Sequence, residues 1–388
     1  MQVQKPLLWW SPTPQASMGS RCTLNAIAPA RVLRGCQAWQ QAQVAIAGLT
    51  ARPLVLGRSG ATAPMRARLL DDLAGGGLKP VAAELRFDCC EEDLGALAPR
   101  ASQAQCDGVI AIGGGKVLDA GKLLAQRLGL ACISVPTSAA TCAGWTALAN
   151  LYSPQGAFRG DVALERCPDL LIFDHDLVAQ APGRTLASGI ADAMAKWYEA
   201  SVSSGESSDG LVQQAVQQAR LLRDLLLLEG QAALANPGSD SWARVAEASA
   251  LTAGLIGGLG GARCRTVAAH AVHNGLTQLS ETHGSLHGEK VGFGILVQLR
   301  LEELVGGNRL AAQARRQLLP FFRSLSLPVA LAELGLANAP LSDLKQVCSF
   351  ACRPDSDLHN LPFAVSSDDL LTSLVSTTTA AVATPRQS

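Results

Sequence analysis

The first half of the chain alternates short apolar runs with segments whose apolar residues recur every three or four positions. The runs predict buried strands at residues 53–57, 79–87, 108–112, 130–137 and 169–174, and the segments between them predict helices at 61–74, 91–104 and 116–129. Strands that alternate with helices imply a parallel sheet covered by helices. Residues 145–158 depart from this alternation and predict a β-hairpin whose turn is Ser153–Gly156.

After about residue 182 the pattern becomes helical throughout. Periodicity of 3.6 residues marks the segments 186–204, 207–228, 241–260, 266–279 and 287–305. We therefore expect an α/β domain over residues 22–181 and an all-helical domain over residues 182–388. Residues 1–21 lack the charged region and long apolar core of a signal peptide, and we interpret them as a loose leader.

Composition narrows the class of protein. The 388 residues are 48% hydrophobic and only 16% charged, with zero formal net charge, so no basic field exists for nucleic acid. A thinly charged surface fits a homo-oligomer. The eleven cysteines contain no CxxC spacing and indicate free thiols in a reducing compartment. The uncharged run 128–158 exceeds membrane-span length, but its Pro, Ser and Thr content favours strand and loop, and we expect a soluble cytoplasmic protein.

A glycine-rich turn follows the predicted strand 108–112. The residues GGGK at 113–116 open the next helix, where backbone N–H groups can approach a phosphate. The spacing is neither GxGxxG nor GxxxxGK[ST], so a tight turn without a ligand is the alternative. Asp119, one turn into the helix, is compatible with a cap or with an ion pair to Lys122.

Histidines gather in one short stretch. Four of the six lie between residues 268 and 290: His270, His273, His283 and His287. Asp192 lies on another predicted helix, amid small and apolar residues, where a carboxylate needs a partner. Two imidazoles and a carboxylate form a common open site for a divalent cation. The alternatives are buried structural histidines and an i,i+4 ion pair of Asp192 with Lys196.

Four motifs together resemble the iron-containing alcohol dehydrogenase superfamily, specifically its glycerol dehydrogenase-like branch. They are GGGKVLD, PTSAATCAGWTALANLY, APGRTLASGIADAMAKWYEA and AAHAVHNGL…HGEKVGFG, and they occur in the family's order between about residues 105 and 300. The resemblance implies a Rossmann-like α/β domain followed by an all-α domain, the fold shared with dehydroquinate synthases. The active site is then expected in the cleft between the two domains.

The resemblance also implies roles for single residues. Asp192, His270 and His287 match the three metal ligands, which also face the substrate, and His273 matches the catalytic histidine beside the nicotinamide. The positions that match cofactor-binding residues are Gly114, Gly115, Lys116, Asp119, Thr137, Ala140, Thr146, Leu148 and Tyr152. Lys196 stands where some iron-dependent relatives carry a fourth ligand, and the similarity to glycerol dehydrogenases favours Zn²⁺ over Fe²⁺.

Two positions depart from the glycerol dehydrogenase pattern. Cys142 replaces an Asp that contacts glycerol, and a thiol neither accepts hydrogen bonds from a diol as a carboxylate does nor repels an anion. The sequence around Cys142 is similar to that of hydroxycarboxylate dehydrogenases. The alternative is that Cys142 is a small buried side chain that only fills space in the core. Arg58 and Ser59 follow the strand 53–57, where NAD-using members carry an acidic residue. They favour NADP over NAD by binding a 2′-phosphate, unless Arg58 is an ordinary surface residue.

The resulting functional expectation is a metal-dependent NAD(P) oxidoreductase acting on the CH–OH group of a small polyol or 2-hydroxy acid. The charge of the cation is expected to lower the pKa of the substrate hydroxyl, and His273 to pass the proton to solvent. The alternatives on the same fold are a sugar-phosphate lyase or cyclase and a glycerol-1-phosphate dehydrogenase. Both need a basic phosphate pocket, and few Lys or Arg residues lie near the motifs. A non-catalytic binding protein is disfavoured by the intact ligand positions.

Overall fold

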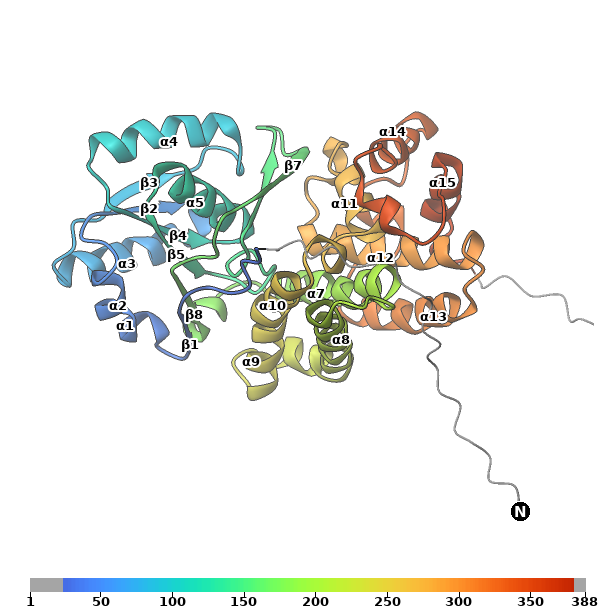
Figure 1. Cartoon of the computed structure of the whole chain (residues 1–388), viewed down its shortest axis with the longest axis horizontal. Helices are drawn as coiled ribbons and strands as arrows, with labels where there is room; N and C mark the ends of the chain where they lie inside the picture. The colour runs from blue at the N-terminus through green and yellow to red at the C-terminus, as the bar shows by residue number, and fades with distance from the viewer. Residues whose placement is uncertain (1–23, 380–388) are drawn as a thin grey trace, which may run out of the picture.

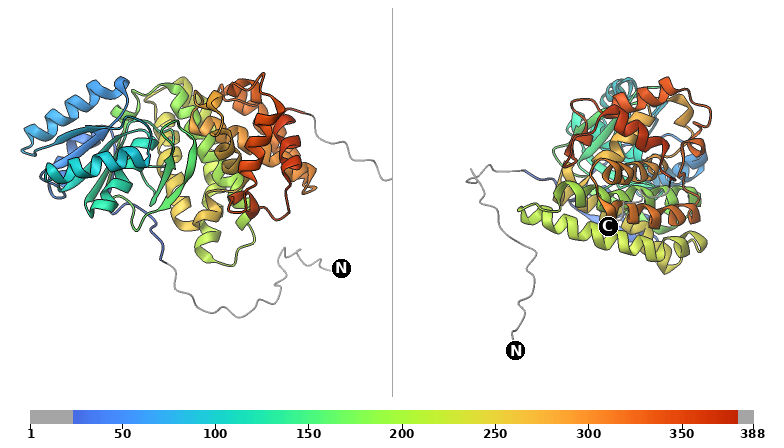
Figure 2. Two further views of the ribbon diagram at one scale, coloured as in Figure 1. Left: turned by 90° about the horizontal axis from the view of Figure 1, so that it is seen from above. Right: turned by 90° about the vertical axis from the view of Figure 1, so that its right-hand side faces the viewer.

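The computed structural model describes residues 24–379. A parallel sheet with its covering helices lies beside a group of packed helices (Figure 1), and the left view of Figure 2 shows the same side-by-side arrangement from above. The expected leader, residues 1–21, lies outside the described residues. Among the described helices, none is long and apolar enough to cross a membrane. The ten cysteines described are all free.

Six parallel strands form the main sheet in the order β1-β8-β5-β4-β2-β3. Their bounds are β1 Val32–Gly35, β2 Pro53–Gly57, β3 Val81–Glu84, β4 Gly108–Gly113, β5 Ala131–Pro136 and β8 Leu170–Asp174. The inner strands β2, β4 and β8 are buried along their whole length. Their near-continuous apolar sequences reflect this, because a parallel sheet is covered on both faces.

Helices cover both faces of the sheet, and alternate residues of β4 show which helices lie where. Ile110 and Ile112 pack in one apolar cluster with residues of α1, α2 and α3, whereas Ala111 packs in another with residues of α4 and α5. The bounds of these helices are α1 Ala38–Gln41, α2 Gln43–Ala47, α3 Ala63–Gly75, α4 Glu91–Gln103 and α5 Gly115–Leu128. The predicted α/β architecture is confirmed in this part of the chain.

The strand order creates a crevice between β2 and β4. These strands are neighbours, but the chain leaves β2 toward β3 on one side and leaves β4 toward β5 on the other. Loops that diverge at the carboxyl ends of adjacent parallel strands leave a crevice in which ligands of α/β proteins bind. The segments that follow Gly57 of β2 and Gly113 of β4 both begin at this crevice.

The hairpin and its predicted turn are present, but the second strand runs beyond the predicted end at residue 158. Strands β6 Leu148–Tyr152 and β7 Phe158–Ala163 pair antiparallel, apart from the main sheet. In the turn, the amide of Gly156 donates to the carbonyl of Ser153 at 2.8 Å, and Gly156 has φ of +94°. That backbone conformation favours glycine, which explains the residue at this place.

Helices make up the rest of the described chain. Their bounds are α6 His175–Val178, α7 Gly183–Ser204, α8 Gly210–Ala235, α9 Asp240–Glu247, α10 Ala253–Gly260, α11 Ala268–Leu276, α12 His287–Leu304, α13 Arg309–Ser324, α14 Leu341–Ala351 and α15 Ser367–Val375. Helix α7 is the central element, because it packs against α8, α10, α11 and α12. Its small residues allow this close packing from several directions: Ala191, Ala193, Ala195 and Ala200 are all buried.

Two predicted elements differ in detail from the structure. The strand expected at 79–87 ends at Glu84, because the Asp93 side chain accepts from the amides of Arg86 and Phe87, both at 2.8 Å, and draws the chain out of the sheet. The helix expected at 241–260 is divided into α9 and α10 by a π-helical turn at Ala248–Thr252. Periodicity over a window does not resolve a single wide turn.

Candidate functional site

A cleft of about 770 Å³ lies between the carboxyl edge of the sheet and the helices α7, α11 and α12. Its sheet wall consists of the segments after β2 and β4 and the segment between β5 and β6. Its helical wall includes Asp192, His270, His273 and His287. The cleft therefore joins the two parts of the chain that carry the predicted site residues.

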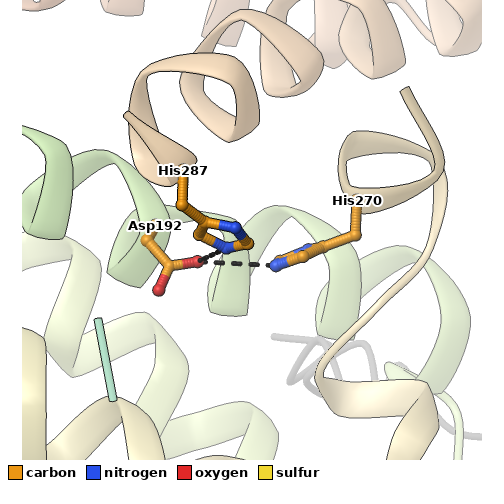
Figure 3. Close-up of side chains that lie close together, drawn as sticks. All are labelled: Asp192, His270 and His287. Atoms are coloured by element: carbon orange, nitrogen blue, oxygen red, sulfur yellow. Dashed lines mark ion pairs between the residues drawn. The ribbon is translucent and has the colours of Figure 1, made fainter. Parts of the chain in front are cut away.

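Three side chains from three helices converge in this cleft (Figure 3). Oδ1 of Asp192 on α7 lies 3.4 Å from Nε2 of His270 on α11 and 3.3 Å from Nε2 of His287 on α12. Their candidate ligand atoms all lie within 4.8 Å of one another. Burial opposes ionisation of Asp192, but the charge of the adjacent His287 and the close approach of both imidazole nitrogens hold its pKa well below the usual value. A negative charge is thus kept at the centre of the group.

Glu199 orients His270. Its Oε2 lies 2.6 Å from Nδ1 of His270, and its Oε1 accepts from the amides of Val267 and His270 at 2.7 and 3.0 Å. Because Nδ1 donates to this carboxylate, Nε2 is left facing Asp192. Burial lowers the pKa of His270, but the charge of Glu199 and the nearby carboxylate of Asp192 outweigh burial and raise it to about 9. Glu199 follows Asp192 by seven residues on the same helix, a signal that sequence reasoning missed.

A tight contact between α12 and α7 holds His287. The amide of Gly288 donates to Oγ of Ser188 at 3.0 Å, and a Cβ on Gly288 would lie 1.8 Å from the Ser188 carbonyl oxygen. Only glycine fits this approach. Glu289 accepts from Arg184 at 2.6 and 2.7 Å, and also from the amide of Leu286 at 2.7 Å. These bonds fix the start of the helix on which His287 is the first residue.

His273 lies beside the group. It is 2% exposed, and its ring centroid lies 4.2 Å from that of His287. Nδ1 of His273 lies 2.9 Å from Oδ1 of Asn274, so this nitrogen carries the hydrogen and Nε2 is free to accept a proton. Burial, followed by the charges of His287 and Lys290, holds the pKa of His273 well below its usual value. The ring is neutral at physiological pH.

The glycine-rich turn lines the opposite wall. Gly114 precedes the first residue of α5, so the start of that helix, where N–H groups lack intrahelical partners, lines the cleft. Lys116 pairs with Asp88, and its Nζ lies 5.0 Å from the ring centroid of Tyr152. Oδ1 of Asp119 lies 3.0 Å from Nζ of Lys122, so Asp119 forms the ion pair with Lys122 that was one of its two expected roles. Burial, despite the charge of Lys122, raises the pKa of Asp119.

The remaining predicted cofactor positions also lie in this cleft: Thr137, Ala140, Thr146, Leu148 and Tyr152 all line it. Lys122, which sequence reasoning did not assign to the site, fixes two of them. Its buried Nζ donates to the carbonyl of Thr146 at 3.0 Å and to the carbonyl of Leu148. Cys142 lines the same cleft, and burial raises the pKa of its thiol.

Arg58 lies at the cleft opening after β2, beside Ser59. Its Nη1 lies 3.0 Å from Oδ1 of Asp88, and Asp88 also pairs with Lys116. One carboxylate, which sequence reasoning missed, therefore links two predicted cofactor residues. Ser59 accepts from the amide of Ala61 at 3.2 Å, so its hydroxyl helps to shape the turn.

The alternative ion pair of Asp192 with Lys196 is not among the ion pairs of the described chain. The ion pairs of Asp192 found in the described chain are with the two imidazoles, whereas Nζ of Lys196 reaches the carbonyl of Arg265 at 3.4 Å. His283 binds the carbonyl of Thr277 through Nε2 at 2.9 Å. The histidines outside the cluster have other partners, as His175 pairs with Glu247 and His359 binds a carbonyl on the surface.

Comparison with known proteins gives a consistent result. Residues 29–175 match the family model described as iron-containing alcohol dehydrogenase. The chain is 61% identical to an uncharacterized oxidoreductase of Synechocystis over 290 residues, which are 75% of each chain. It is 36% identical to hydroxycarboxylate dehydrogenase A of Escherichia coli, over 74% of this chain and 78% of that one.

Solved structures agree with the sequence relatives. The crystal structure of a probable glycerol dehydrogenase from Sinorhizobium meliloti is similar, with a TM-score of 0.79 and 29% sequence identity. The superposition covers 90% of this chain and 96% of that chain, so both the sheet and the helices take part in the likeness.

Proposed function

The chain belongs to the iron-containing alcohol dehydrogenase family and is an oxidoreductase acting on alcohol groups, and from this premise we propose that it is a metal-dependent NAD(P) oxidoreductase of a small polyol or 2-hydroxy acid. One observation carries the proposal. Asp192, His270 and His287 converge from three helices in a cleft whose other wall is a glycine-rich strand-to-helix turn. The cation and the dinucleotide would then meet in one cleft.

We assign the two roles to two parts of the chain. Residues 22–181 would form the dinucleotide-binding domain and residues 182–388 the metal-binding domain. The crevice between β2 and β4 supports the first assignment, because dinucleotides bind at such switch points. The origin of all three ligand candidates on α7, α11 and α12 supports the second.

The three residues fit a divalent cation. Oδ1 of Asp192 is buried and has no hydrogen-bond partner among the described residues, so it is available as a ligand. The donor set of one carboxylate oxygen and two imidazole nitrogens suits Zn²⁺ and also Fe²⁺, and leaves coordination positions open. We favour Zn²⁺, because Lys196 stands where iron-dependent relatives carry a fourth ligand.

The chain's own residues position the reaction. A bound cation would supply positive charge that favours loss of the alcohol proton, and a bound nicotinamide would supply the hydride chemistry. Glu199 holds His270 in the tautomer that leaves Nε2 toward Asp192. His273 lies buried beside His287, and its Nδ1 is used by Asn274, so its Nε2 would accept the substrate proton and later return it.

We propose that NADP is preferred over NAD. Arg58 and Ser59 follow β2 at the crevice, where an adenosine 2′-phosphate would lie, and the Arg58 side chain is 43% exposed. Asp88 competes for Arg58, but Lys116 shares the charge of Asp88 and weakens that competition. The pyrophosphate would bind the N–H groups at the start of α5.

One assay panel tests the proposed function. Purified protein loaded with Zn²⁺ or Fe²⁺ would be given NAD(H) or NADP(H) with glycerol, 2-oxobutanoate, 2-oxoglutarate or a phosphorylated polyol. Absorbance at the reduced-nicotinamide wavelength reports turnover. We expect turnover of a polyol or oxo acid, faster with NADP(H). Absence of turnover with every substrate and both cations contradicts the proposal, and faster turnover with NAD(H) contradicts the cofactor preference.

A further inference from the structure

Two cationic side chains of the helical wall lack strong partners. Lys196 is 4% exposed, and the hydrogen bond of its Nζ found in the described chain is a single contact of 3.4 Å to the Arg265 carbonyl. Nε of Arg265 is buried and has no hydrogen-bond partner among the described residues. A buried cation without an anionic partner is costly. Lys196 is buried and Arg265 is half-buried, and no ion pair of either is found in the described chain, so both charges are available to an anionic ligand.

Both side chains lie at the place where a substrate would bind. Lys196 follows Asp192 by one helical turn on α7, about 6 Å along the axis. Lys196, Arg265 and Asp192 all line the cleft, together with Cys142. The contact of Lys196 Nζ with the Arg265 carbonyl oxygen places the two residues side by side in the cleft wall. Burial raises the pKa of the Cys142 thiol in the same wall, and the charges of Lys196, Lys122 and Arg265 oppose that rise.

The position of Arg265 is fixed by packing. A Cβ on Gly257 of α10 would lie 2.9 Å from Cγ and Cδ of Arg265, so the arginine stem occupies the space that this glycine leaves. A stem held in this way loses little further freedom when its guanidinium binds a ligand. The nearby Cys142 is a neutral thiol and does not repel an anion.

Carboxylates also line the cleft and set a limit on where an anion can bind. Asp161 and Asp357 are two of them, and burial raises the pKa of Asp357, whose carboxyl is hydrogen-bonded to the Thr266 side chain. An anionic substrate group is favoured beside Lys196 and disfavoured beside these acids. The charge pattern thus orients a substrate that is anionic at one end.

We propose that Lys196 and Arg265 together bind a carboxylate of the substrate, and that the substrates are 2-oxo acids and the corresponding 2-hydroxy acids. This inference rests on the proposed function and selects one of its two substrate classes. In the reductive direction, the carbonyl carbon gains a hydride from NAD(P)H, the carbonyl oxygen gains a proton, and NAD(P)⁺ and the 2-hydroxy acid leave. The carboxylate does not react, but it places the adjacent carbonyl near Asp192, His270 and His287.

The test compares 2-oxobutanoate with 2-oxobutanamide, which has the same carbon chain and no charge. For the wild type, we expect kcat/KM for the acid to exceed that for the amide by about 50-fold, as suits hydrogen bonds to charged groups. In Lys196→Met and Arg265→Gln this ratio should fall below about 5, through KM more than kcat. Arg265→Lys should recover part of the ratio, because it restores the charge.

Matched substitutions outside the cleft control for loss of charge alone. Lys345 and Arg316 are exposed on α14 and α13, and Lys345→Met and Arg316→Gln should keep the wild-type ratio. Inhibition by oxamate, a non-reactive anion, gives a second readout: its inhibition constant should rise in Arg265→Gln. If Lys196→Met does not fold, the acid-to-amide ratios of the Arg265 variants and their oxamate inhibition constants still test the proposal.

The outcomes separate this inference from the proposed function. Turnover of glycerol, of the amide or of a phosphorylated polyol in preference to 2-oxobutanoate overturns the carboxylate assignment but leaves the dehydrogenase intact. An unchanged acid-to-amide ratio in Arg265→Gln also overturns it. Absence of nicotinamide turnover with every substrate, charged or neutral, instead overturns the proposed function on which the inference rests.

Discussion

The two walls of the cleft hold their charged side chains in different ways. On the sheet wall, Arg58 and Lys116 both pair with Asp88. On the helical wall, Oδ1 of Asp192 has no hydrogen-bond partner among the described residues, and Lys196 makes one long contact. The sheet wall thus offsets part of its positive charge internally, whereas the helical wall presents charges of both signs without such internal pairing.

This difference suggests that the sheet wall binds the dinucleotide and that the helical wall carries the groups for the redox reaction. A dinucleotide can be held by backbone N–H groups and the crevice shape without unsatisfied side-chain charges. Redox chemistry at an alcohol carbon needs charge where the reacting oxygen lies, and this charge is placed on the helical wall. Substitutions on the helical wall should therefore have larger effects on turnover than those on the sheet wall.

The largest effect is expected for Asp192→Asn. The change keeps the size of the side chain and removes the negative charge, so the cation should be lost together with activity. We expect a loss of kcat/KM greater than the roughly 100-fold that removal of a supporting residue causes. Metal analysis and a steady-state assay measure the two losses, and circular dichroism checks that the fold is kept. A variant that retains its metal and its turnover contradicts the ligand assignment.

His273→Ala should reduce turnover without releasing metal. Loss of a residue that transfers protons typically lowers the rate by about 10²- to 10⁴-fold. The kcat should fall in this range while the metal content stays at the wild-type value, because His273 stands beside the three ligand candidates and is not one of them. If the metal is lost as well, His273 has been misassigned.

Glu199→Gln should weaken metal binding more moderately. The carboxylate orients His270, and losing such a supporting group costs about 10- to 100-fold in metal affinity or activity. A competition titration with a chelating dye would measure the affinity. The exposed Glu206 offers a matched control, since it lies outside the cleft and Glu206→Gln should bind metal like the wild type. Equal metal affinity in Glu199→Gln and Glu206→Gln would contradict the supporting role of Glu199.

The smallest effect is expected on the sheet wall. Arg58→Ser should lower kcat/KM with NADP by about 10-fold, the lower end for a charged hydrogen bond at a partly exposed side chain. The value with NAD should change little. Asp88→Asn should act in the opposite direction, because it releases Arg58 and Lys116 toward the phosphate. Kinetics with both cofactors test this pair, and equal losses with NAD and NADP in Arg58→Ser would end the assignment.

Local patterns in the sequence anticipated much of the fold. The alternation of strands and helices, the hairpin turn at Ser153–Gly156 and the helices carrying Asp192 and His270 all occur where periodicity and turn residues indicated them. Strand β1 was not predicted, because its four residues give too short a pattern and its partner β8 lies far along the chain. The shortened β3 depends on a side chain, Asp93, that no periodicity reports.

The partners of the site residues were harder to predict. Glu199 meets His270 across 71 positions, and Asp88 meets Lys116 across 28. Such pairs form only when the chain has folded, and a lone acidic residue gives no sign of which cation it will meet. Arg265 was missed for the same reason, since its lack of a strong partner is visible only once its neighbours are in place.

The central claim is that one divalent cation is held by three side chains from α7, α11 and α12 and is required for turnover. Metal analysis of the purified protein, combined with NAD(P)-linked activity before and after treatment with a chelator, tests it most directly. The account predicts about one divalent ion per chain, loss of activity on chelation and recovery with Zn²⁺ or Fe²⁺. Full activity in protein that carries no cation and is indifferent to chelator would contradict it.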